Sequence, residues 1–83
     1  MNSDTAQEIT KRLPKGMKVL TVTPSGVMFL TFDGCKRRSV MVEERVGYTR
    51  VYHRFEGKII DERTAYNLNG IIKWIKMYQS DIY

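Results

Sequence analysis

The sequence has little of what most metal and redox sites are built from. Among its 83 residues there is one cysteine, Cys35, and one histidine, His53. A single cysteine excludes an intrachain disulfide, and one cysteine with one histidine excludes a zinc site of the usual Cys/His type. A lone thiol also fits a reducing cytosol. Because no cofactor motif appears either, we expect neither a metal nor a cofactor.

Long apolar runs are missing as well. No apolar stretch approaches the length of a transmembrane helix. The first residues, MNSDTAQEITKRL, have polar side chains where a secretion signal needs an apolar core. We therefore expect a cytoplasmic protein that does not enter a membrane.

Acidic residues are also fewer than basic residues. Nine Asp and Glu stand against fourteen Lys and Arg, which gives a net charge of +5. Such an excess favours encounter with polyanions such as nucleic acid or an acidic protein face. Apolar residues, in contrast, make up 42% of the chain, enough for one modest core. At this length we expect residues 1–83 to form a single domain.

Turn residues divide most of the chain into one helix and several strands. A short amphipathic helix is predicted from Thr5, whose hydroxyl can cap it, to Leu13, just before Pro14. Residues 23–26, TPSG, have the composition of a hairpin turn. The predicted strands cover residues 17–23, 26–32, 37–44 and 48–55, and the short segment KII is the candidate for a fifth.

The clearest periodic signal lies near the C-terminus, where Asp61 opens a helix predicted from about residue 62 to residue 80. Its apolar side holds Leu68, Ile71, Ile72, Ile75, Tyr78 and Ile82. The predicted fold class is therefore α+β. It comprises a short N-terminal helix, a four- or five-stranded antiparallel meander and a long C-terminal amphipathic helix packed on one face.

The segment YTRVYHRF, residues 48–55, is the main candidate binding site. Read as a strand, it puts four side chains on one exposed face: Tyr48, Arg50, Tyr52 and Arg54. The preceding strand adds a basic run of Lys36, Arg37 and Arg38. Arginine and lysine bind phosphates, and tyrosine rings stack on unpaired bases. Two interpretations stay open: a surface for nucleic acid or an acidic protein, and the ordinary solvent side of a sheet.

A second partner surface is predicted on the C-terminal helix. Its residues are Tyr66, Lys73, Trp74 and Met77. They flank Gly70, which costs helix stability and suggests that something approaches closely there. Either a partner protein or second subunit binds this stripe, or the first helix or the tail SDIY covers it.

His53 is the only candidate for acid–base chemistry. Alternation turns it inward, where a neutral ring hydrogen-bonded through one nitrogen is the expected state. No carboxylate stands at a spacing that would orient it, so we expect no enzyme and no small-molecule substrate. A small ribonuclease-like toxin is the third hypothesis, and it requires His53 to face solvent.

The sequence thus favours a small basic binding protein, either a nucleic-acid-binding or a transcription-regulatory accessory factor of the phage or plasmid type. The alternative is a protein-interaction module, such as an inhibitor, adaptor or corepressor. The expected partners are DNA, RNA or a protein bound to nucleic acid. Residues 17–23 and 26–32 are apolar on both faces, more than one short helix can cover, so a homodimer is also predicted.

Overall fold

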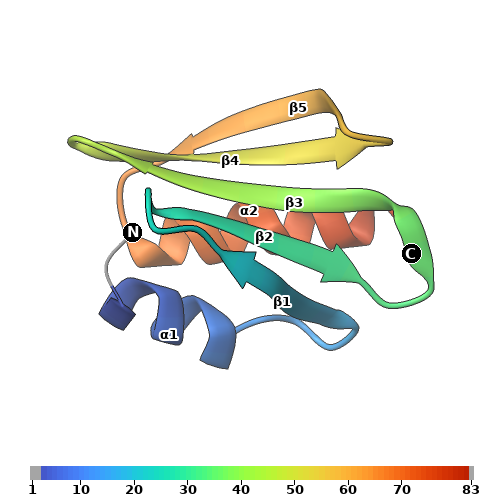
Figure 1. The fold of residues 1–83 in the computed structure, drawn as a ribbon, viewed down its shortest axis with the longest axis horizontal. Helices are drawn as coiled ribbons and strands as arrows, with labels where there is room; N and C mark the ends of the chain where they lie inside the picture. The colour runs from blue at the N-terminus through green and yellow to red at the C-terminus, as the bar shows by residue number, and fades with distance from the viewer. Residues whose placement is uncertain (1–2, 83) are drawn as a thin grey trace.

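The computed structural model describes residues 3–82 as an α+β fold and confirms the predicted architecture. Five antiparallel strands follow one another in chain order, with one helix before them and one after (Figure 1). The elements are α1 (Ser3–Lys11), β1 (Met17–Val22), β2 (Val27–Phe32), β3 (Cys35–Arg45), β4 (Tyr48–Phe55), β5 (Lys58–Ala65) and α2 (Leu68–Ser80). The first four strands lie within two residues of their predicted bounds, and β4 matches at both ends.

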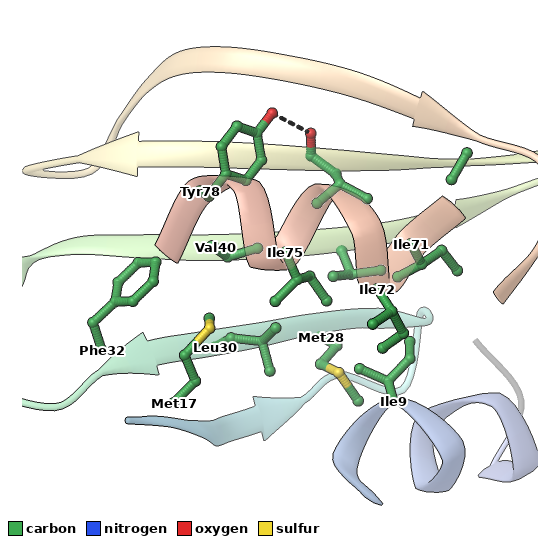
Figure 2. Close-up of a cluster of buried hydrophobic side chains, with 13 residues drawn as sticks. Ile9, Met17, Met28, Leu30, Phe32, Val40, Ile71, Ile72, Ile75 and Tyr78 are labelled. Carbon is green, nitrogen blue, oxygen red and sulfur yellow. Dashed lines mark hydrogen bonds between the residues drawn. The ribbon is translucent and has the colours of Figure 1, made fainter. Parts of the chain in front are cut away.

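Both helices pack on the same face of the sheet, and the core lies between them and the strands. In Figure 2, Ile9 of α1 and the isoleucines of α2 lie together with the inward side chains of the strands. Ile72 and Ile75 are buried, as the apolar periodicity predicts. Burial of each such side chain contributes about 1.5–3 kcal/mol. Tyr78 ends this stripe, and its hydroxyl donates a hydrogen bond to the Val51 carbonyl oxygen at 3.2 Å.

A two-residue turn joins β4 and β5 and pairs Phe55 with Lys58, although the register shifts between Arg54 and His53. Glu56 and Gly57 have φ values of 51° and 82°, both in the left-handed region. A two-residue hairpin turn needs this conformation at both central positions if its twist is to match that of the strands. Glycine adopts it without strain because it has no Cβ. The chain therefore reverses at once and continues as β5.

The predicted start of the last helix is wrong. Residues 58–65 form β5, whose pairing with β4 extends from Phe55 and Lys58 to Thr49 and Ala65. Helix α2 therefore begins at Leu68 rather than at residue 62. The segment DERTA has reasonable helix propensity, but the backbone groups along β4 offer it a ladder of hydrogen bonds, and tertiary context overrides propensity.

An N-cap residue precedes α2. Asn67 is extended, with φ −154° and ψ 172°, and its side chain accepts a hydrogen bond from the Gly70 amide at 2.8 Å. This is the geometry of an N-cap. Helix α1 already begins at Ser3, so Thr5 lies inside the helix and the predicted cap at Thr5 is wrong.

Candidate binding surface

The face of the sheet opposite the helices carries the predicted Tyr/Arg side chains of β4. Within residues 3–82 no helix lies over this face, because α1 and α2 both pack on the other one. Alternation and strand register arrange its side chains in rows that cross the strands. The first row is Lys18, Thr31, Ser39 and Arg54; the middle row is Thr21, Phe29, Met41, Tyr52 and Glu62; the third row is Val27, Glu43, Arg50 and Thr64. These three rows define what we call the open face.

The first row sets two hydroxyl groups between two cations. Thr31 and Ser39 are register partners on β2 and β3, with Lys18 on one side and Arg54 on the other. Lys18 Nζ lies 3.5 Å from Asp33 Oδ1, in an exposed pair that is worth little. Arg54 Nη2 donates to the Gly57 carbonyl oxygen at 3.1 Å, which fixes the guanidinium. Cations and hydroxyls arranged in this way suit an anion such as a phosphate.

The centre of the middle row is apolar, and its one tyrosine is buried. Phe29 and Met41 are half-buried beside Tyr52, which is only 9% exposed. The Tyr52 hydroxyl donates to Glu43 Oε1 at 3.1 Å. Burial, reinforced by this hydrogen bond to the Glu43 carboxylate, raises the pKa of Tyr52. Tyr52 therefore lies on the predicted face, but the expectation that it is exposed is wrong, because its ring fills space between neighbouring side chains.

The arginines of β4 stack on rings. Arg54 Cζ lies 5.6 Å from the centre of the Phe29 ring, and Arg50 Cζ lies 5.9 Å from that of Tyr48. Arg50 also pairs with Glu62, Nη1 to Oε1 3.4 Å. Arg54 differs from Arg50 in that it has no carboxylate partner within residues 3–82. Along β4, the positive charge that no carboxylate balances is therefore that of Arg54, in the first row.

Carboxylates neutralise the opposite end of the open face. Arg45 contacts Glu43 Oε1 through Nε at 2.9 Å and Nη2 at 2.8 Å. The hydrogen bond to Glu43 and its negative charge raise the pKa of Arg45. Together with the Arg50 and Glu62 pair, this contact leaves the third row with little net charge.

A groove of about 470 Å³ at the β2–β3 turn continues the first row. Lys36 and Arg38 line it together with Lys18, Thr31 and Ser39. The basic run does not form one continuous patch on the open face. Arg37 shares the outward alternation of Ser39, and its Nε lies 3.8 Å from Glu56 Oε1. Arg38 alternates to the helix side, where its guanidinium lies 5.2 Å from the centre of the Phe55 ring.

The second predicted surface is not a stripe on one helix. Tyr66 precedes α2 and is 79% exposed, whereas Met77 packs partly against the core. Trp74 Nε1 donates to the Thr64 carbonyl oxygen at 3.1 Å, and Lys73 Nζ lies 5.0 Å from the centre of its ring. Lys73, Trp74 and Met77 thus make local contacts within the chain, whereas Tyr66 is exposed.

Gly70 has an internal explanation. A Cβ placed on Gly70 would lie 3.3 Å from the Cβ of Ala65, which is closer than most such contacts. The close approach that the sequence suggested is thus made by the end of β5, not by a partner.

His53 is buried, as alternation predicts, and is only 2% exposed. Its Nε2 has no hydrogen-bond partner within residues 3–82, so the expected hydrogen bond is not found at that atom. Rings occupy the neighbouring space, with the centres of Phe32 and Tyr78 at 6.1 and 4.8 Å. Burial, with a smaller contribution from the charge of Arg38, lowers the pKa of His53.

Lys18, Phe29 and Thr31 belong to the surface but are missed by sequence reasoning. Their positions beside Arg54 depend on the register of four strands, including a shift between Thr31 and Phe32 in the pairing of β2 with β3. The only signal in the sequence is the alternation within VMFLTF. It predicts on which face of the sheet a side chain lies, but not which side chains of other strands lie beside it.

Comparisons with protein family models, curated protein sequences and solved structures give no match to this chain. No helix among the described residues has the length and apolar character needed to cross a membrane. Residues 3–82 also contain no group of three or more His, Cys, Asp or Glu side chains positioned to hold a metal ion.

Proposed function

We propose that this chain is a small, basic, non-enzymatic protein that binds single-stranded nucleic acid on its open face. The observation that carries the proposal is the row of Lys18, Thr31, Ser39 and Arg54 beside the row that holds Phe29 and Met41. Side chains on one face of a strand are two residues apart, about 6.6 Å. A single strand laid across the sheet therefore has its phosphates at the first row and its bases at the second.

The pair of Arg54 and Phe29 supports binding of unpaired bases. A base can stack on an aromatic ring or on the plane of a guanidinium group, and such stacking tolerates any sequence. A duplex keeps its bases stacked inside and would offer this face only its phosphates. A protein that occupies a single strand in this way acts as a regulatory accessory factor.

The ribonuclease hypothesis needs His53 at the surface to act as a base. His53 is instead 2% exposed and lies on the helix side of the sheet. We keep the cytoplasm as the proposed location, since Cys35 has no second cysteine in this chain with which to pair.

Fluorescence anisotropy with labelled oligo-dT and oligo-U, measured at several salt concentrations, tests the proposal. Lys18→Ala and Arg54→Ala should each weaken binding and reduce the salt slope by about 0.7 for each phosphate that the variant no longer binds. Lys76→Ala is the matched control, because it removes the same charge from an exposed position on α2. Phe29→Leu should weaken binding by about 1–3 kcal/mol, since it keeps an apolar side chain but removes the stacking ring.

The proposal is wrong if the wild-type chain has no affinity for single strands at low salt, or if Lys76→Ala acts as strongly as Arg54→Ala. A duplex bound as tightly as a single strand would also exclude base stacking. If the Lys18 and Arg54 variants instead lose capture of a purified acidic protein, the protein-interaction alternative is correct.

A further inference from the structure

A second concave site lies at the end of the molecule opposite the β2–β3 turn. It is a cleft of about 370 Å³ between α1, the β3–β4 turn and the start of α2. The β3–β4 turn and the start of α2 lie at the left in Figure 1. Segments far apart in the sequence meet there, since the lining extends from Asp4 to Ile71. The volume is in the range of sites that hold a specific ligand. This cleft shares no residue with the first row of the open face or with its groove.

The cleft is acidic in a chain whose net charge is +5. Asp4 and Glu8, four residues apart on α1, lie on the same side of that helix, and Glu44 lies across from them at the end of β3. Among the described lining residues Arg45 is the one cation, and it is already bound to Glu43 through two nitrogens. Lys11 Nζ lies 3.7 Å from Glu8 Oε1, but this pair is exposed and is worth little. The field in the cleft therefore favours a cation.

Thr49 is an independent sign that the cleft takes a ligand. It lines the cleft and is 8% exposed, yet its side chain makes no hydrogen bond within residues 3–82. Polar side chains this deeply buried usually have a hydrogen-bond partner. Among residues 3–82 the only fully buried side-chain atom without one is His53 Nε2, so the Thr49 hydroxyl keeps some accessible surface. A hydroxyl at the wall of the cleft can accept a hydrogen bond from an ammonium or guanidinium group.

The remaining walls suit a long aliphatic side chain with a charged end. Tyr48 and Tyr66 stand at the cleft as exposed rings, and a cation within about 6 Å of a ring centre is attracted by its π-electrons. Leu68 and Ile71 add apolar surface on which the methylene groups of lysine or arginine can lie.

We propose that this cleft binds a lysine or arginine side chain of a basic segment of a partner protein. The carboxylates of Asp4 and Glu8 receive the charge, the hydroxyl of Thr49 receives one N–H group, and the tyrosine rings enclose the side chain. The partner's basic side chain fits by charge complementarity, and the exposed mouth leaves room for the backbone that carries it. The proposal does not depend on nucleic-acid binding, because it uses the opposite end of the molecule.

The test uses the full chain and a fluorescein-labelled hexalysine peptide, with hexaglutamate as the opposite-charge control. A basic protein should repel hexalysine unless a local acidic site binds it, so binding of this probe is informative. The double variant Asp4→Asn, Glu8→Gln should weaken binding by about tenfold or more, since hydrogen bonds to charged groups are the strong ones. Thr49→Val, similar in shape, should weaken it severalfold.

The matched control is Glu56→Gln, Glu62→Gln, which removes two carboxylates outside the cleft and should leave hexalysine binding unchanged. In the wild type, amide NMR shifts on titration should concentrate at Thr49 and Leu68. Circular dichroism checks that each variant is folded, and oligo-dT binding by the Asp4, Glu8 variant should match the wild type, which keeps the two proposals separable.

Absence of hexalysine binding at low salt overturns the inference, as does equal weakening by the control pair. Spermidine that competes as well as the peptide would make the ligand a free amine and not a protein. Self-association of the free chain that disappears in the Asp4, Glu8 variant would make the occupant a second copy, which also contradicts a separate partner.

Discussion

His53 is a titratable side chain held inside an apolar core. The charged groups around it are Arg38, Asp61 and Asp81, and burial, together with Arg38, lowers its pKa from 6.5. Below that value the unfolded chain takes up a proton that the folded chain resists. The free energy of unfolding should therefore fall as the pH decreases below about 7, and it should be fully retained above that pH.

For one titrating group this loss cannot exceed about 1.4 kcal/mol for each pH unit. Urea unfolding at a series of pH values measures it. His53→Leu should flatten the pH dependence there, because His53 is the only histidine and carboxylates titrate at lower pH. A variant that keeps the wild-type slope would show that another group is responsible.

Tyr52 combines an outward position with a structural role. Because it is 9% exposed, Tyr52→Ala should lower the free energy of unfolding by about 3 kcal/mol, near the lower end for buried aromatic side chains. Tyr52→Phe should cost about 0.5–1.5 kcal/mol, since it removes only the hydrogen bond to Glu43. Tyr66→Ala, at a position 79% exposed, is the control and should change stability little. Chemical denaturation distinguishes these results, and equal effects of Tyr52→Ala and Tyr66→Ala would contradict the structure.

At the scale of elements, the start of α2 depends on a single cap. Asn67→Ala should destabilise the chain by about 1 kcal/mol, because the Gly70 amide then loses its acceptor. Asn67→Asp keeps an acceptor oxygen at the same place and should retain most of the stability. Thermal unfolding followed by circular dichroism compares the two. If Asn67→Asp is as destabilising as Asn67→Ala, the cap does not contribute through this hydrogen bond.

The sequence predicts β4 well and β5 poorly, for a physical reason. In YTRVYHRF, polar and apolar residues alternate and β-formers dominate, so local pattern and final structure agree. Residues 61–65, DERTA, show no apolar alternation, because β5 is an edge strand whose outward positions are wet. β5 is extended because it pairs with β4 and follows the turn at Glu56. Neither effect can be recognised from its helix-like composition.

At the scale of the molecule, the meander separates charge along the strands. The β2–β3 and β4–β5 turns lie at one end, with Lys36 beside the first and Arg54 and Lys58 beside the second, whereas the acidic cleft lies at the other end. Composition gives the net charge of +5 but not this separation. The sequence predicts the meander order of the strands, but their register comes from long-range pairing, so the rows of the open face could not be predicted even though each strand's outward residues could.

The predicted homodimer fits one edge of the sheet better than the other. β1 is an edge strand, and its Leu20 is 67% exposed at a register shift, with Val22 also exposed beside it. Two-fold contact between β1 strands would cover these apolar side chains and leave the open face accessible. The register shift limits backbone pairing across that edge, so we expect a weak dimer, detectable by light scattering only at high micromolar concentration.

Leu20→Lys should make the chain monomeric, whereas Ile60→Lys, at a position 51% exposed on β5, should leave the dimer intact. A wild-type monomer at high concentration would rule out the dimer, and loss of the dimer in Ile60→Lys alone would move the contact to β5.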